Sequence, residues 1–159
     1  MKYHWSVIRT RARWEKKVAG LLSQKGIDVF CPLQKSRNQW SDRIKTVEKP
    51  LLKSFVFVRI KEDQRTDVRL TEGVVNFVYR DGKPVVIKDK TLQKIKTFQK
   101  IHPEVHVSEP AVTNGDNEEH AVKLNIKSKY PKLLLETLNL VLIPRSVHSA
   151  LAAATTDKI

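Results

Sequence analysis

Residues 54–60 read SFVFVRI and form the clearest strand in the sequence. The segment is almost continuously apolar and rich in β-branched and aromatic side chains, which is typical of a central strand buried on both faces. A strand of this kind needs other strands beside it and further layers over it. The fold is therefore expected to be built around a sheet with this segment near its centre.

Upstream of this strand, residues 3–9 alternate in polarity as a strand does, and residues 27–33 form another apolar run. The apolar residues between them recur at helical spacing: Trp14, Val18, Leu21 and Leu22. This pattern predicts a helix that packs on the sheet, capped by Thr10 and ended by Gly26. The same pattern favours a Trp14 ring that packs against the sheet over one that is exposed and stacks on the base of a nucleic acid.

Residues 34–49 are polar and basic and predict a hairpin with its tip at Asn38-Gln39 or Ser41-Asp42. Downstream, we expect a helix over residues 63–72, strands over 74–79 and 84–87, and a helix from Asp89 that ends before Pro103. The order predicts an α+β fold, an antiparallel four-stranded sheet flanked by helices.

The chain is expected to divide into an N-terminal domain (1–103), a linker (104–119) and a small C-terminal module (120–159). The linker is rich in Pro, Ser, Asn, Glu and Asp. Alternating apolar residues favour β structure in the C-terminal module, and its fold stays open.

Charge narrows the class of partner. The 159 residues include 30 Lys and Arg against 17 Asp and Glu, a formal charge of +13, and residues 1–60 hold 14 basic and 4 acidic side chains. Such a field attracts a phosphate backbone or an acidic protein surface, and it is also compatible with a solvated surface that keeps the protein soluble.

Catalytic and cofactor motifs are missing from the sequence. The five histidines lack metal-ligand spacing, no glycine-rich phosphate loop exists, and Cys31 before Pro32 fits a buried thiol better than a nucleophile. We therefore expect no enzyme activity, no cofactor and no metal. The single cysteine, the lack of an apolar signal core and the shortness of the longest apolar run predict a cytoplasmic protein with no membrane contact.

Three blocks of the sequence, together with their spacing, resemble a known family. They are HWSVIRTRARWEKKVAGLLSQKGI, FCPLQKSRNQWSDRIKTVEKPLLKSFVFVRI and TEGVVNFVYRDGKPVVI, within residues 3 to about 101. They are similar to the N-terminal (NGN) domain of NusG-type transcription elongation factors, which has a ferredoxin-like or RRM-like sheet. Among these factors the chain looks closest to the specialised antitermination paralogues of the UpxY kind, which act on particular long operons.

The resemblance implies binding to RNA polymerase at the clamp helices of its β′ subunit. In this sequence the implied contact residues are Leu52, Phe55 and Phe57. For Phe57, the sequence is equally compatible with a place in the hydrophobic core and with a contact to the polymerase. Specialised members also touch the β-subunit gate loop with a Thr-rich element, which here contains only Thr66. The expected factor is a monomer that promotes processive transcription of specific operons.

The resemblance also implies contact with the non-template DNA strand, or with nascent RNA, at the first strand–helix junction. The basic residues of that region are Arg9, Arg11, Arg13 and Lys17. Arginine offers forked donors to phosphates and base edges, and an exposed Trp40 has the ring needed to stack on a base.

Two features depart from the family pattern. Lys53-Ser54 stands where the family usually has Pro-Gly or Pro-Asn. The family also ends in a glycine-dependent KOW barrel, whereas this chain has no glycine after Gly115. The contacts that family members make through that barrel do not carry over.

Two other classes of function are considered. A stand-alone basic RNA-binding module would place aromatic residues on an exposed sheet, yet SFVFVRI lacks the glycine-containing consensus of such domains. A structural partner protein that uses its basic face on an acidic surface fits the charge alone.

Overall fold

The computed structural model describes residues 2–108, 133–135, 138 and 140–144. The chain divides into two compact units, residues 1–96 and 97–159. The first unit holds the predicted sheet and is described first.

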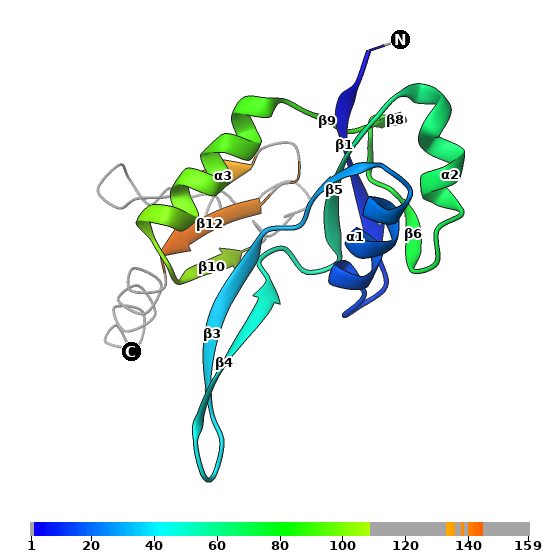
Figure 1. Ribbon diagram of the computed structural model, residues 1–159. Coiled ribbons are helices and arrows are strands. Elements are labelled where there is room, and N and C mark those ends of the chain that lie inside the picture. Colours follow the sequence, from blue (N-terminus) through cyan, green and yellow to red (C-terminus); the bar gives the residue numbers. More distant parts are fainter. Residues whose placement is uncertain (1, 109–132, 136–137, 139, 145–159) are drawn as a thin grey trace, which may run out of the picture. The chain divides into compact units, whose positions relative to one another are not determined.

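The main sheet of the first unit is antiparallel and has the order β2-β5-β1-β6 (Figure 1). Its strands are β1 (His4–Thr10), β2 (Asp28–Phe30), β5 (Phe55–Ile60) and β6 (Val74–Phe77). A short fifth strand, β9 (Val86–Ile87), also pairs with β1. The expected α+β class and antiparallel sheet are confirmed, and SFVFVRI supplies the inner strand β5 between β2 and β1.

One face of this sheet is covered by two helices, α1 (Glu15–Gln24) and α2 (Arg65–Arg69). Side chains of one parity on the strands share a buried cluster with both helices, since strand side chains alternate between faces. The cluster contains Ile8, Val18, Leu22, Ile27, Val56, Val58, Ile60, Val68 and Phe77. The expected helix over 63–72 is shorter, because its first turn is the 3₁₀ segment η1 (Glu62–Gln64).

The boundaries of α1 differ from the expectation at the start and agree at the end. Thr10 does not cap the helix, because it belongs to β1 and its hydroxyl donates to the carbonyl of Arg11. Trp14 occupies the N-cap position without a side-chain hydrogen bond. Gly26 follows the helix with φ of +79°, a left-handed conformation that glycine adopts without strain.

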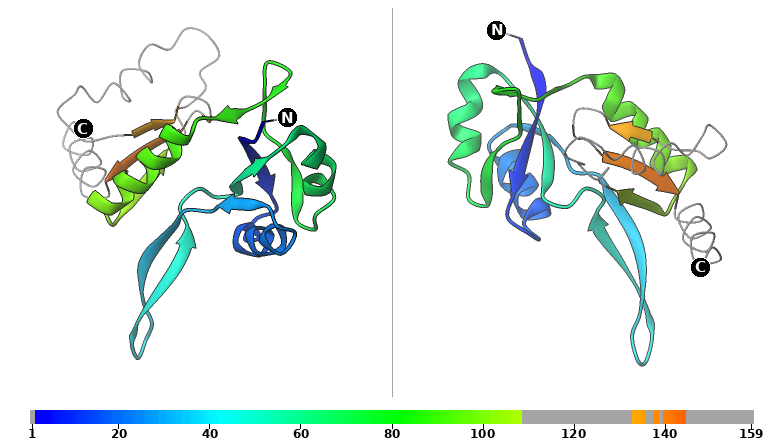
Figure 2. Two further views of the ribbon diagram at one scale, coloured as in Figure 1. Left: turned by 45° about the horizontal axis from the view of Figure 1, so that its top comes forward. Right: turned by 180° about the vertical axis from the view of Figure 1, so that it is seen from behind.

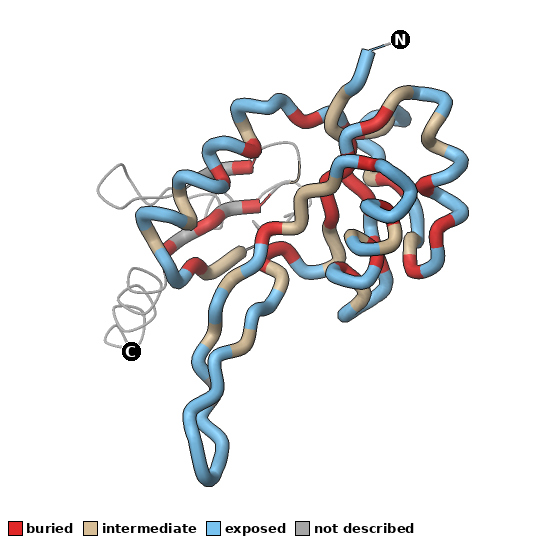
Figure 3. Tube along the Cα trace, viewed as in Figure 1, coloured by how far each residue is buried: buried red, intermediate tan, exposed pale blue. Residues whose placement is uncertain are grey.

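A long hairpin of β3 (Leu33–Gln39) and β4 (Ile44–Pro50) extends away from the sheet (Figures 1 and 2). Those of its residues whose burial is described are exposed or half-buried (Figure 3). The tip is closed by the N–H of Trp40, which donates to the carbonyl of Arg43 at 2.8 Å. Ser41-Asp42 therefore lies at the tip, one of the two predicted positions.

After β6, a second, shorter hairpin pairs β7 (Tyr79–Arg80) with β8 (Lys83–Pro84) and turns at Asp81-Gly82. The helix α3 (Asp89–Ile101) begins at the predicted Asp89 and ends before Pro103.

The second unit contains a three-stranded antiparallel sheet in the order β10-β12-β11. The strands are β10 (Val105–Ser108), β11 (Leu133–Leu135) and β12 (Leu140–Pro144), with Leu135, Leu140 and Leu142 buried. The start of the expected linker thus forms β10. Residues 109–119 of that linker, and residues 120–132 of the expected C-terminal module, lie outside the described residues. No described helix is long and apolar enough to cross a membrane.

Candidate functional site

The loop that leads into β5 is held in place by backbone and carboxylate contacts. The carbonyl of Ser54 accepts the N–H of Thr10 at 2.9 Å, and the N–H of Ser54 donates to a carboxylate oxygen of Glu15 at 2.8 Å. Glu15 lies in the first turn of α1 and is only 4% exposed. These bonds fix the start of β5 against the β1–α1 junction.

Ser54 has a left-handed backbone with φ of +65°. Glycine and asparagine enter this region at the lowest cost, and the family resemblance places one of these two residues here. The backbone conformation that suits glycine or asparagine is thus present although the sequence reads Lys53-Ser54. The bonds to Thr10 and Glu15 hold the serine in a conformation that it adopts less readily.

The expected polymerase-contact residues differ in accessibility. Phe55 is half-buried, and the guanidinium carbon of Arg9 lies 5.7 Å from its ring centroid. Phe57 is fully buried, with its ring centroid 5.8 Å from that of Phe30, and Leu52 is 1% exposed. Phe55 is therefore the member of this set with accessible side-chain surface.

Thr66 is exposed on α2, the helix that packs over β6 on the other face of the sheet from Phe55. The structure does not bring it together with the other expected contact residues. The two faces follow from parity, since Val56 and Val58 point to the helices while Phe55 and Phe57 point away from them.

The expected nucleic-acid-binding residues gather at the β1–α1 junction, and all four are exposed: Arg9, Arg11, Arg13 and Lys17. Among the described residues, no carboxylate lies within ion-pair distance of any of them. Arg9 pairs in register with Phe55, so this one cation lies beside the accessible aromatic ring. The junction thus presents unpaired positive charge next to Phe55.

Trp14 contacts both the buried cluster and two of these basic side chains. Its ring packs against the buried cluster, as its helical spacing predicts. The ring also lies 4.3 Å from Nζ of Lys17 and 5.7 Å from the guanidinium carbon of Arg11. Cation–π contacts of this kind hold the two basic side chains at the junction.

Three residues that hold this surface in place were not predicted from the sequence: Gly73, Glu15 and Lys16. Gly73 approaches Trp14 so closely that a Cβ at Gly73 would lie 2.5 Å from the ring, and its carbonyl accepts the N–H of Arg11. Glu15 bonds the start of β5, and Nζ of Lys16 donates to the carbonyl of Glu48 in the long hairpin. A buried carboxylate and a close-packed glycine have no signature in a single sequence, because both depend on tertiary neighbours.

The described residues contain no cluster of three or more His, Cys, Asp or Glu side chains that could hold a metal ion. Cys31 follows β2 and packs against the buried cluster. Burial, and secondarily the charge of Glu15, raise the pKa of its thiol to about 11, while Lys16 acts in the opposite direction. Cys31 is therefore a protonated structural thiol at neutral pH.

Comparisons with known proteins assign the family. A family model described as transcription termination factor nusG matches residues 3–96. A solved structure of Thermotoga maritima NusG, titled for its domain interaction, is similar with 22% sequence identity and a TM-score of 0.47. The match covers 74% of this chain and 69% of that one. No curated protein matches the chain. Because the family model spans more than half of the sequence, the chain belongs to the NusG family, whose members are transcription factors and not enzymes.

Proposed function

We propose that this protein is a transcription elongation and antitermination factor that binds RNA polymerase at the clamp helices of the β′ subunit. The supporting observation is the adjacent pair of Phe55, a partly accessible ring at the start of the central strand, and Arg9, an exposed cation beside it. Interfaces usually depend on a few aromatic anchors surrounded by polar contacts, and Phe55 has the position of such an anchor.

The basic junction supports a second contact of the same factor, with the non-template DNA strand or nascent RNA near the polymerase. Arg11 and Lys17 stack on Trp14 and keep their charges exposed. Phosphate contacts position a protein on nucleic acid without reading its sequence, so recruitment to particular operons requires base contacts as well. We also propose that the protein acts on specific operons, as paralogues of the UpxY kind do. A factor of this kind acts in the cytoplasm, where polymerase works.

The polymerase contact is tested by capture on a purified clamp-helix fragment of the β′ subunit. Phe55→Asp is expected to lower capture at least tenfold, since a desolvated carboxylate is costly in an apolar interface. Tyr79→Asp is the matched control, because Tyr79 is another accessible aromatic residue of the first unit, 44% exposed. Circular dichroism checks that both variants fold.

Equal capture of wild type and folded Phe55→Asp would remove Phe55 from the contact. A charged substitution at Leu52 is less informative, because a carboxylate at a position that is 1% exposed perturbs folding as well as binding. If wild type is not captured and instead binds RNA alone, the stand-alone RNA-binding module becomes the better account.

A further inference from the structure

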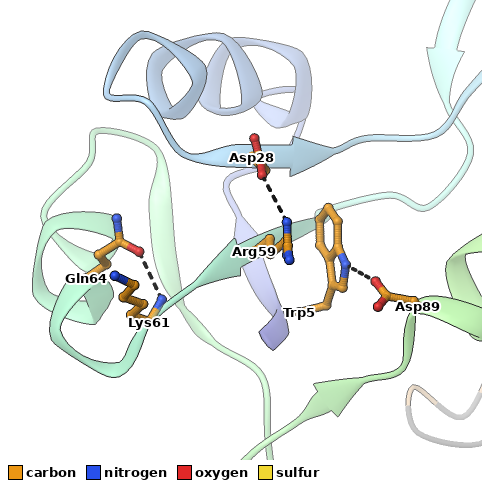
Figure 4. Close-up of polar contacts among 6 residues, drawn as sticks. All are labelled: Trp5, Asp28, Arg59, Lys61, Gln64 and Asp89. Atoms are coloured by element: carbon orange, nitrogen blue, oxygen red, sulfur yellow. Dashed lines mark hydrogen bonds and ion pairs between the residues drawn. The ribbon is translucent and has the colours of Figure 1, made fainter. Parts of the chain in front are cut away.

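A cleft of about 760 Å³ lies in the first unit at the end of the sheet remote from Arg9. Its walls come from β1, the loop between α1 and β2, β5 and the start of α3, and they include Trp5, Asp28, Arg59 and Asp89 (Figure 4). Trp5 and Arg9 are four residues apart on β1, and a strand rises about 3.3 Å per residue, so the two residues are about 13 Å apart along the strand. The cleft is a separate site.

Trp5 forms a fixed wall of the cleft. Its indole N–H donates to Oδ1 of Asp89 at 2.6 Å, which sets the orientation of the ring (Figure 4). Oδ2 of Asp89 accepts no hydrogen bond from the described residues, and the carboxylate stays available to a ligand. Trp5 pairs in register with Arg59, so the ring and the guanidinium lie on neighbouring strands.

The cleft is lined by a positive side chain, Arg59, and a negative one, Asp28, and both are accessible to solvent. Arg59 contacts Asp28 only loosely, with 3.7 Å between Nη1 and Oδ2, and their side chains are 47% and 70% exposed. Next to the cleft, Tyr3 is half exposed, with Arg59 at 5.3 Å and Nζ of Lys61 at 4.8 Å from its ring. Aromatic rings, carboxylate acceptors and two cations therefore lie side by side.

We propose that this cleft binds one nucleotide of a single-stranded nucleic acid, with guanine as the preferred base. Unstacked bases bind proteins by stacking on aromatic rings and by hydrogen bonds along their edges. Trp5 and Tyr3 offer the rings, Asp28 and Asp89 offer acceptors, and Arg59 and Lys61 offer cations for the phosphate. The base and the phosphate of the nucleotide thus each have matching groups.

Guanine fits the acceptors because its Watson–Crick edge carries two adjacent donors, an imino N–H and an amino group, which match carboxylate oxygens. Adenine offers an amino group and no imino N–H on that edge. A basic peptide is disfavoured, because its guanidinium or ammonium group would meet Arg59 inside the cleft and the +13 charge of the chain outside it.

The test uses the full chain and labelled pentanucleotides with a central G or A, in both an RNA (U) and a DNA (T) background. The wild type is expected to bind the G oligonucleotide about tenfold more tightly than the A oligonucleotide. Asp89→Asn keeps an acceptor for the indole N–H of Trp5 and removes the charge. This variant and Asp28→Asn are each expected to lower the ratio of G to A affinity towards one. Asp42→Asn, which removes one carboxylate from the tip of the long hairpin, is the control.

Two further measurements separate the cleft from the basic junction. Arg59→Gln is expected to weaken the binding of both oligonucleotides equally and to lower the slope of log K against log salt by about 0.7, while Lys83→Gln does not. In NMR spectra, guanosine monophosphate is expected to shift the indole N–H signal of Trp5, identified by its loss in Trp5→Phe. Arg11→Glu is expected to weaken the binding of the G and A oligonucleotides by the same factor, so that the ratio of their affinities stays as in the wild type.

Equal affinity of the wild type for G and A oligonucleotides overturns the proposal, and so does an unchanged preference in both carboxylate variants. Binding of an arginine-containing peptide in place of either oligonucleotide would assign the cleft to a protein partner instead. Tighter binding of the RNA series than of the DNA series supports a contact to the ribose hydroxyl. Equal binding of the two series supports recognition of base and phosphate alone. Capture by the clamp helices is measured separately and does not depend on this result.

Discussion

Glu15 shows how a single carboxylate positions the candidate polymerase contact. It is 4% exposed, lies in the first turn of α1, and accepts the N–H of Ser54, the residue before Phe55. A carboxylate near a helix N-terminus is favoured by the helix dipole, and it also satisfies an N–H at the start of β5. The accessible ring of Phe55 thus depends on a buried acid that is 39 residues earlier in the chain.

Cys31 provides a prediction at this scale. Its pKa is raised from 9.0 to about 11, chiefly by burial, so the reactive thiolate is scarce below that pH. At pH 8 we expect iodoacetamide to alkylate Cys31 about 100-fold more slowly than a thiol with pKa 9.0, since two pKa units change the thiolate fraction by that factor. The rate should still rise between pH 9 and pH 11.

The measurement is mass spectrometry of the alkylated chain over a pH series, with the protein unfolded in urea as the reference. Alkylation of the folded protein at the rate of the unfolded one at pH 8 would show that Cys31 is accessible and not shifted.

At the scale of elements, the turn before β6 lies close to α1 and to its N-cap residue Trp14. Gly73 has φ of +89°, and a Cβ there would lie 2.5 Å from Cε3 of Trp14 and 2.8 Å from Cγ2 of Val18. Gly73→Ala is therefore expected to destabilise the fold by about 2 kcal/mol, from overpacking and from strain in the left-handed region. The measurement is the free energy of unfolding in urea.

Gly20 is the matched control for this prediction. It lies within α1, and a Cβ there meets no atom within 4 Å. Gly20→Ala is expected to stabilise the protein by about 0.5–1 kcal/mol, because alanine is the better helix former. Equal effects of the two substitutions would contradict the close contact at Gly73.

At the scale of elements, sequence patterns predicted most of the first unit. The helical spacing of Trp14, Val18 and Leu22 predicts α1, and the apolar run SFVFVRI predicts the inner strand β5. The errors have local causes. Thr10 was wrong as a cap because β1 extends through it, and residues 27–33 divide into β2 and β3 at Cys31-Pro32, where proline lacks an N–H for the ladder.

The residues of the candidate site were proposed from the sequence, and their binding role stays a prediction; their geometry comes from the structure. The clustering of Arg9, Arg11 and Lys17 follows from their positions around one strand–helix junction. The burial of Leu52 and Phe57, by contrast, depends on how strands pair and what packs on them, which a single sequence does not specify. The contribution of Gly73 was missed for the same reason.

For the whole molecule, the dominant property is charge. The formal charge is +13, and the exposed cations of the β1–α1 junction have no carboxylate partner among the described residues. Arg11→Glu is expected to weaken binding to single-stranded DNA and to lower the slope of log K against log salt by about 0.7 for each lost phosphate contact. The measurement is fluorescence anisotropy at several salt concentrations.

Arg80→Glu makes the same charge change on the short hairpin β7–β8, and serves as the control for net charge. If the two variants lose affinity equally at every salt concentration, binding follows the total charge and not the β1–α1 junction.

The long hairpin of β3 and β4 has a consequence for how such a protein diverges. Between Lys35 and Lys49 none of the described side chains is buried, so a substitution or a change of length there leaves the folding core untouched. Mutations in this segment carry little penalty in protein abundance, and selection on them acts through binding alone. Homologous copies that serve different genes are therefore expected to differ most along this ribbon and least in the strands beneath it.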